Sequence, residues 1–153
     1  RLLVRGAESE GDSLAGLLRT MAGLQPRLVE TDGRRLVAEV LRRTPHRALV
    51  VLFTSLDEAA ISEGILPSLG SLTARHTVVL AAVTDPVVAA MTTGLTDAEA
   101  VYDAAAAERT LASQRRIAAL LNRLGVDVVQ GGPEQFASKV ADAYLALKAA
   151  GRL

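Results

Sequence analysis

The chain has 153 residues, enough for one domain, and half of them are hydrophobic, so it can bury a sizeable core. Its 17 basic and 17 acidic residues balance, which removes the general attraction that nucleic-acid binders and polybasic membrane anchors use. The lack of Cys excludes disulfides, thiolate metal ligands and Cys nucleophiles. We therefore expect a soluble domain with no nucleic-acid partner and no direct insertion into a membrane.

The first part of the chain is expected to be mainly helical. Leu2 to Val4 is an apolar run compatible with a short strand, and Gly11 to Ser13 opens a helix. A second helix follows, with Thr31 or Asp32 as its N-cap. The side chains expected to form its buried stripe are Leu36, Val37, Val40 and Leu41.

Three apolar runs further along the chain predict parallel strands. Ala48 to Phe53 is continuous and apolar without alternation, which is typical of a strand covered on both faces. Thr77 to Val83 repeats this pattern, and Val126 to Val129 supplies the last strand. Aromatic residues make up only 3% of the chain, so an interface built on large aromatic anchors is not expected.

Helices are predicted between and after these strands. Leu56 to Ala74 is helical and is kinked or split at Pro67. Asp85 caps a short helix with Pro86 at its first position. The spacing of Thr96 and Glu99 forms a capping box for the longest helix, which should end at Gly125 after burying Ile117, Leu120, Leu121 and Leu124.

The closing helix is predicted over Pro133 to Ala150, after the turn at Gly131 and Gly132. Strands and helices thus alternate, with connections too long for hairpins, which favours right-handed βαβ units. The expected fold is a three-layer, doubly wound α/β domain with a mostly parallel sheet. The whole chain, 1–153, is expected to be one domain.

Candidate functional residues follow the first two long strands, because ligands of open α/β sheets bind beyond the carboxyl ends of the strands. These residues are Thr54, Ser55, Asp57 and Asp85. Their hydroxyl and carboxylate oxygens suit a hard cation such as Mg²⁺. The alternative is that Ser55 and Asp57 only cap the next helix, as Asp85 caps its own.

Nucleophilic catalysis is not expected from this sequence. The only histidines, His46 and His76, precede strands and therefore lie at the opposite edge of the sheet from Ser55. No glycine-rich phosphate loop occurs. We expect a binding module rather than an enzyme, with a Mg²⁺-dependent hydrolase or phosphotransferase using Asp57 and Asp85 as the alternative.

Several segments together resemble the von Willebrand factor A-like domain of a bacterial family of unknown function whose genes accompany MoxR-type AAA+ ATPases. The resemblance covers essentially the whole chain. The segments that carry it are Leu49 to Asp57, Leu24 to Asp32, Asp85-Pro86, Tyr102 to Ala106 and the ending Tyr144 to Leu153.

The resemblance implies a metal-dependent adhesion site that captures an acidic group of a partner. Thr31 matches the family's isolated Thr ligand, Ser55 stands where the family has an Asp, and Asp57 is a substitute two residues on. The family's Asp-x-Ser-x-Ser segment is not in this chain. The resemblance therefore implies a degenerate or incomplete site, with Mg²⁺ bound only in an intact parent protein.

The resemblance also implies a cellular setting. The chain begins at Arg1 without Met, and we expect it to be the C-terminal portion of a longer, membrane-anchored protein, facing the cytoplasm. Its partner is expected to be a MoxR-type ATPase or the client that this ATPase assembles. In the von Willebrand order a further strand would pair with Ala48 to Phe53, so the exposed sheet edge predicts a homodimer or a swap of Leu2 to Val4.

Overall fold

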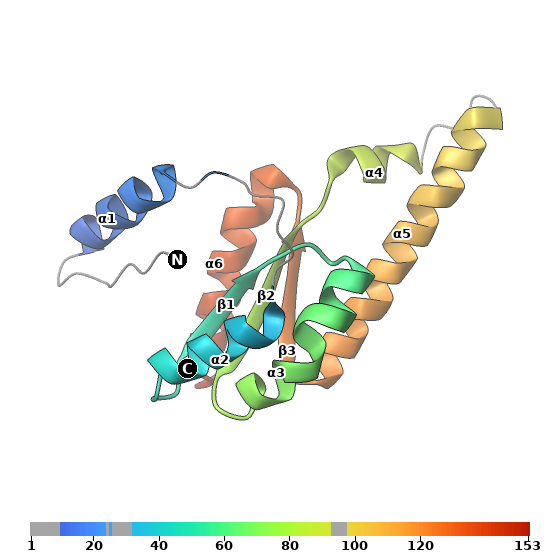
Figure 1. Ribbon diagram of the computed structural model, residues 1–153. Coiled ribbons are helices and arrows are strands. Elements are labelled where there is room, and N and C mark those ends of the chain that lie inside the picture. Colours follow the sequence, from blue (N-terminus) through green and yellow to red (C-terminus); the bar gives the residue numbers. More distant parts are fainter. Residues whose placement is uncertain (1–9, 24, 26–31, 93–97) are drawn as a thin grey trace. The chain divides into compact units, whose positions relative to one another are not determined.

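The computed structural model describes residues 10–23, 25, 32–92 and 98–153 (Figure 1). The chain divides into two units, Arg1–Thr31 and Asp32–Leu153. The first unit contains α1 (Glu10–Ala22), which begins one residue before the predicted start. The strand expected over Leu2 to Val4 lies outside the described residues.

The second unit is built on a parallel sheet of three strands. These are β1 (Leu49–Phe53), β2 (Thr77–Val83) and β3 (Val126–Gly131), in the spatial order β1-β2-β3. All three strands were predicted within two residues of these bounds. The prediction of an α/β fold with a parallel sheet is therefore confirmed.

The central strand β2 is buried on both faces, because it has a strand on each side and helices above and below. Its residues from Thr77 to Ala82 are all buried, and only Val83, at the carboxyl end, is exposed. The prediction of a strand covered on both faces is thus confirmed for Thr77 to Val83. It is wrong for Ala48 to Phe53, because β1 lies at the edge of the described sheet and most of its residues are only half-buried or exposed.

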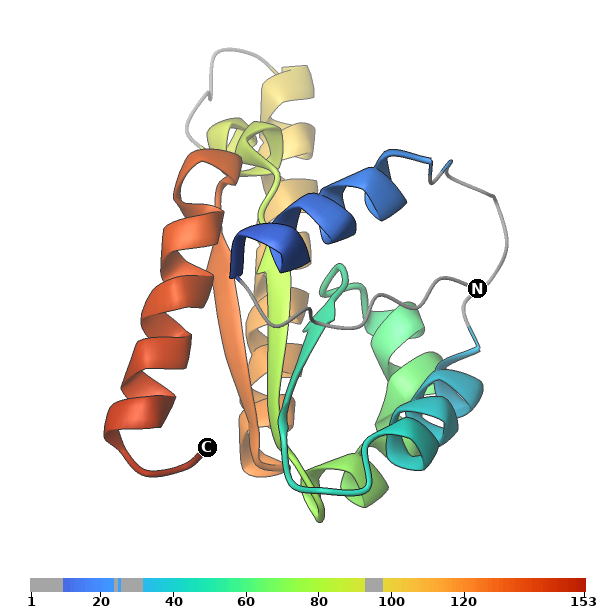
Figure 2. The same cartoon turned by 90° about the vertical axis from the view of Figure 1, so that its left-hand side faces the viewer.

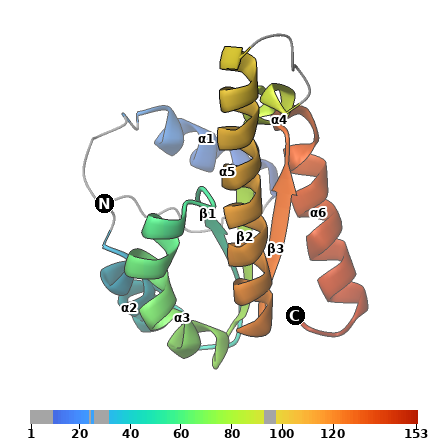
Figure 3. The same cartoon turned by 90° about the vertical axis from the view of Figure 1, so that its right-hand side faces the viewer.

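Helices cover the two faces of the sheet unequally (Figures 2 and 3). One face carries the large core, to which α2 (Gly33–Arg43), the π-helix η1 (Ala60–Ile65), α3 (Leu66–Thr73) and α5 (Ala98–Arg123) contribute side chains. The other face packs against α6 (Pro133–Ala149), which contacts β3 and β2. The large core therefore lies on one side of the sheet and a thinner layer lies on the other.

The largest fully buried side chains all belong to the thicker layer or to β2. They are Ile61, Leu69, Leu72, Leu80, Leu121, Val78, Val79 and Val126. The face predicted for the Leu56 to Ala74 helix, with Ile61, Ile65, Leu69 and Leu72 inward, is confirmed by their exposed fractions of 7% or less.

Pro67 divides this helix as predicted. A wide-turn π-helix, η1 (Ala60–Ile65), precedes α3, and Pro67 lies in the first turn of α3. Proline has no N–H, and its ring clashes with the carbonyl four residues earlier in a regular α-helix. The wider turn relieves this conflict, and the N–H of Leu66 bonds the carbonyl of Ile61 five residues back.

Helix caps follow the sequence signals in the described regions. Asp32 caps α2 by accepting a hydrogen bond from the N–H of Arg35 at 2.9 Å. Gly125 follows α5 with a φ of 82°, the left-handed conformation that glycine adopts without strain. Thr96, predicted to open the capping box of α5, lies outside the described residues.

Three leucines predicted to be inward are exposed instead. Leu36, Leu120 and Leu124 have exposed fractions of 38%, 37% and 41%. The buried stripe of α2 is centred on Gly33 and Val37, which leaves Leu36 on its flank. Leu124 follows the last residue of α5, where the chain turns away at Gly125.

No helix in the described part of the chain is long and apolar enough to cross a membrane.

We predict that Gly33 cannot be replaced by Ala without loss of stability, because an added Cβ would overlap the backbone carbonyl of Gly64. Gly33→Ala should lower the free energy of unfolding by about 2 kcal/mol, the range of overpacking in a tight site. Gly70→Ala is the matched control, since its Cβ would meet nothing within 4 Å and Ala favours the helix. Urea unfolding of both variants checks this, and equal stabilities would contradict it.

Candidate functional site

The predicted site residues of the second unit lie at the carboxyl edge of the sheet. Thr54 and Ser55 directly follow β1, and the backbone N–H of Thr54 still bonds the carbonyl of Ala81 at 3.2 Å. Asp57 follows two residues later, and Asp85 lies two residues after the end of β2. Thr31, the candidate from the first unit, lies outside the described residues.

Both carboxylates act as helix caps. An oxygen of Asp57 accepts from the backbone N–H of Ala60 at 2.9 Å, in the first turn before η1. An oxygen of Asp85 accepts from the N–H of Val87 at 2.8 Å, at the start of α4 (Pro86–Met91), with Pro86 in the first turn. The capping interpretation of Asp85 is confirmed, and Asp57 also serves as a cap.

The described residues do not assemble a metal-binding cluster of acidic and histidine side chains. No group of three or more His, Cys, Asp or Glu residues among them is placed to hold an ion. Ser55 is exposed, and the hydroxyl of Thr54 lies 3.4 Å from the carbonyl oxygen of Ser55. A metal site built on Thr31, Ser55 and Asp57 therefore stays a prediction of the family resemblance.

An aromatic pair lies at this edge. The rings of Phe53 and Phe136 meet edge to face, with centroids 6.1 Å apart and planes at 67°. These are the only two Phe residues in the chain. Phe53 ends β1 and is 67% exposed, whereas Phe136, in the first turn of α6, is half-buried.

The aromatic pair lines a shallow hollow of about 240 Å³ together with Thr54, Ser55, Ala81 and Val83. Val83, the last residue of β2, is 53% exposed. We call Phe53, Val83 and Phe136 the strand-end patch. Asp57 and Asp85 do not line this hollow, so the acidic caps and the apolar patch are separate features of one edge.

A second hollow, of about 310 Å³, lies between the starts of α4 and α6. Pro86 lines it from α4, and the segment Gly132 to Gln135 lines it from α6. Val87, in the first turn of α4, is 56% exposed and adds apolar surface to the same edge. The carboxyl edge therefore offers concave and apolar surface rather than a cluster of free charges.

The opposite edge of the sheet is closed by the segment around Arg152. Its carbonyl accepts from the hydroxyl of Thr77 at 2.6 Å and from the guanidinium of Arg47 at 3.4 Å. The guanidinium of Arg152 holds Asp127 through two contacts of 3.1 and 2.9 Å. His46 and His76 lie at this edge, as predicted, and His76 is buried with neither ring nitrogen bonded to any residue that the structure describes.

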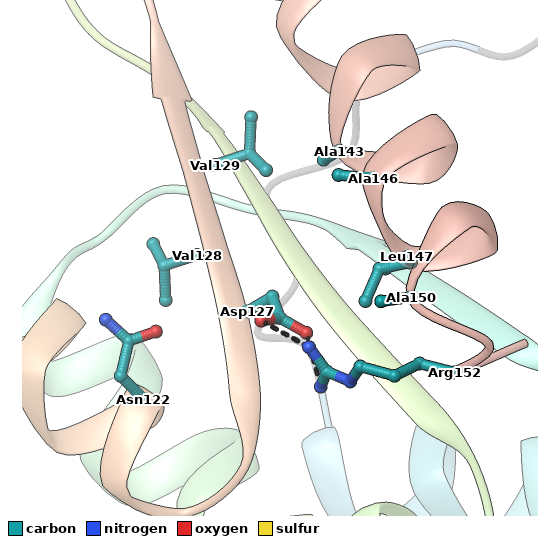
Figure 4. Close-up of a pocket in the computed structure, with 9 residues that line it drawn as sticks. All are labelled: Asn122, Asp127, Val128, Val129, Ala143, Ala146, Leu147, Ala150 and Arg152. Atoms are coloured by element: carbon teal, nitrogen blue, oxygen red, sulfur yellow. Dashed lines mark hydrogen bonds and ion pairs between the residues drawn. The ribbon is translucent and has the colours of Figure 1, made fainter.

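A third hollow runs along the outer side of β3 between α5 and α6 (Figure 4). It has a volume of about 430 Å³, and small or aliphatic side chains form most of its wall. Asp127 and Arg152 are its charged lining residues, and they pair with one another. Because these two charges pair with one another, neither of them is available to recognise a charged ligand.

The aromatic pair is the feature that sequence reasoning missed. The low aromatic content argued against such a surface. Composition gives the number of aromatic residues but not where the fold places them. A signal was nevertheless present: Phe53 ends one strand and Phe136 opens the helix after another. In a parallel sheet both of these places fall at the same edge.

Comparisons of the chain with family models, with curated proteins and with solved structures find no match.

We predict that Asp85 contributes stability as a cap. Asp85→Ala should lower the free energy of unfolding by about 1 kcal/mol, because the N–H of Val87 loses its acceptor. Asp85→Asn is the matched control, and its free energy of unfolding should stay close to that of the unmodified chain, since an amide oxygen also caps a helix. Thermal unfolding monitored by circular dichroism checks both variants. Equal destabilisation by Ala and Asn would show that the charge matters and not the cap.

We predict that the 153-residue chain has no measurable specific affinity for Mg²⁺. A hard cation prefers six oxygen ligands, and the carboxylates of Asp57 and Asp85 each already accept a backbone hydrogen bond. Calorimetric titration of Mg²⁺ into the chain should give only heats of dilution. Saturable binding that disappears in Asp57→Asn would contradict this expectation.

Proposed function

We propose that this domain is a protein-interaction module that binds its partner through the carboxyl edge of its sheet. The observation that carries this proposal is the exposed aromatic side chain of Phe53, held against Phe136 at 6.1 Å. Aromatic side chains bury a large area for few rotatable bonds, and they are enriched among residues that dominate binding energies.

The surroundings of the strand-end patch support this role. Apolar side chains form most of the lining of the hollow, and Thr54 and Ser55 add polar groups to it. An apolar centre with a polar rim is the usual arrangement of a binding surface. The hollow of about 240 Å³ is small and open, which suits a single side chain of a partner better than a buried substrate.

A catalytic role has less support. A Mg²⁺-dependent hydrolase or phosphotransferase would use Asp57 and Asp85 to hold its metal. Each of these carboxylates is engaged in capping a helix, and neither lines a hollow beside a nucleophile. We therefore favour a binding function without catalysis.

The partner that we propose is a MoxR-type AAA+ ATPase or its client, with this domain held at the cytoplasmic face of the membrane by its parent protein. This identity rests on the family resemblance of the sequence. The von Willebrand factor A-like assignment is part of the same proposal, and the parallel α/β sheet is compatible with it.

A direct test measures binding of the full chain to a purified MoxR-type ATPase by biolayer interferometry. Phe53→Ser should weaken binding by tens of fold, the scale of about 2 kcal/mol that a central aromatic contact supplies. Leu145→Ser is the matched control, because Leu145 is similarly exposed at 58% but lies in the second half of α6.

The two variants separate the outcomes. Loss of binding in Phe53→Ser with retained binding in Leu145→Ser supports the strand-end patch as the interface. Equal binding by the parent and Phe53→Ser would exclude the patch. If the parent chain shows no binding to the ATPase, this choice of partner is wrong.

A further inference from the structure

The outer edge of β1 has no strand partner among the described residues. Within the sheet β1 pairs only with β2. The carbonyl of Ala48 and the N–H of Thr54 both bond residues of β2. Backbone groups alternate in direction along a strand, so the N–H and carbonyl groups of Leu49, Val51 and Phe53 face the outer edge.

The two edges of this sheet differ in protection. At the β3 edge the ammonium group of Lys139 donates to the carbonyl of Gln130 at 3.1 Å. A lysine at a sheet edge commonly prevents another strand from pairing there, and Lys139 does so here by bonding an outward carbonyl. The sequence of β1 is Leu-Val-Val-Leu-Phe, which contains no charge and no proline. The β1 edge therefore has none of this protection in its own sequence.

The face of β1 toward α6 is also only partly covered. Phe53 points to this face, since it meets Phe136 of α6, and alternation places Leu49 and Val51 on the same face. Leu49 and Val51 are half-buried and Phe53 is exposed. In contrast, Leu52 on the other face is buried in the core. Leu49, Val51 and Phe53 thus combine outward-facing backbone groups with apolar side chains that are not fully buried.

We propose that a second copy of this chain occupies this edge, with the two β1 strands antiparallel and a two-fold axis at Val51. The inference does not rest on the ATPase-binding role proposed above, although both proposals use Phe53. Pairing of this kind would join two three-stranded sheets into one continuous sheet of six strands.

The symmetry of the edge favours a second copy. The three residues with outward backbone groups are centred on Val51. A two-fold axis there pairs Val51 with the partner's Val51 and Leu49 with the partner's Phe53. Each of these facing pairs exchanges two backbone hydrogen bonds, so every outward group of β1 finds a partner. The same pairing places the Leu49 side chain of one copy beside the larger Phe53 side chain of the other.

Charge favours the antiparallel direction. Arg47 lies just before β1 and is exposed, whereas Asp57 and Glu58 lie just after it and are exposed. An antiparallel pair brings the basic end of each copy toward the acidic end of the other. A parallel pair would instead bring Arg47 toward the partner's Arg47, which opposes association.

The test uses the absence of natural Cys, which makes single-cysteine cross-linking unambiguous. Val51→Cys places two thiols opposite one another across the axis, about 5.5 Å apart between Cα atoms, within disulfide reach. Leu49→Cys is the matched control, since the two Cys residues would be separated by about 13 Å along the strands. A mixture of Leu49→Cys and Phe53→Cys should again cross-link.

Oxidised Val51→Cys should therefore run as a covalent dimer and oxidised Leu49→Cys as a monomer. Equal cross-linking of both single variants, or of neither, would overturn the antiparallel pair centred on Val51.

Hydrogen exchange of the unmodified chain tests the same pairing without a substitution. The amides of Leu49, Val51 and Phe53 should gain protection as protein concentration rises, while those of Val50 and Leu52 stay protected throughout because they bond β2. Sedimentation equilibrium should show a dimer. Val51→Lys should weaken dimerisation at least tenfold, with Val101→Lys, at a 52% exposed position of α5, as the control.

A monomer with free exchange at the three amides would overturn the proposal. A monomer in which they are protected at every concentration would also overturn it, because a segment of the same chain would then cover the edge.

Discussion

The parallel pairing of β2 with both of its neighbours is the interaction on which the rest of this unit depends. The register aligns Phe53 with Ala81 and Ala81 with Val129, and so it places the ends of all three strands at one edge. β2 is enclosed by strands on both sides and by apolar layers on both faces. Backbone groups buried so deeply must be bonded, which makes this register costly to change.

The two faces of the sheet are covered unequally because different helices pack against them. The core on one face is supplied by α2, η1, α3 and α5, and its buried side chains are mostly Leu, Ile and Val. The other face receives α6, whose inner side offers Ala143, Ala146 and the buried Leu147. Small side chains let α6 approach β3 closely. At this position α6 does not fully cover β1. The exposure of Phe53 is a consequence of this geometry.

Most of the fold could be predicted from the sequence because the signals are local and agree with one another. The apolar runs of β1 and β2, the cap of α4 at Asp85 and the division at Pro67 each depend on a few neighbouring residues. The inward faces of α2 and α5 were predicted less well. Helical spacing gives the period of a stripe but not which side meets a neighbour, and in α2 the side that meets Gly64 is the one with Gly33.

The candidate site was predicted in position but not in character. Thr54, Ser55, Asp57 and Asp85 follow β1 and β2 at the carboxyl edge of the sheet, as expected, because this placement depends only on strand direction. The chemistry of that edge depends on contacts between distant segments. The Phe53 and Phe136 rings are 83 positions apart in the chain, and no local pattern relates them.

The same edge residues also connect stability with binding. Asp57 and Asp85 are polar groups at a place where cations often bind, yet each already accepts the N–H that begins a helix. A carboxylate that gives up this bond to a ligand leaves an unsatisfied backbone donor at the helix start. Apolar contact with Phe53 has no such cost, since it only removes exposed hydrocarbon from water. Recognition at this edge is therefore easier to reconcile with the fold when the apolar patch provides the affinity and the carboxylates keep their structural role.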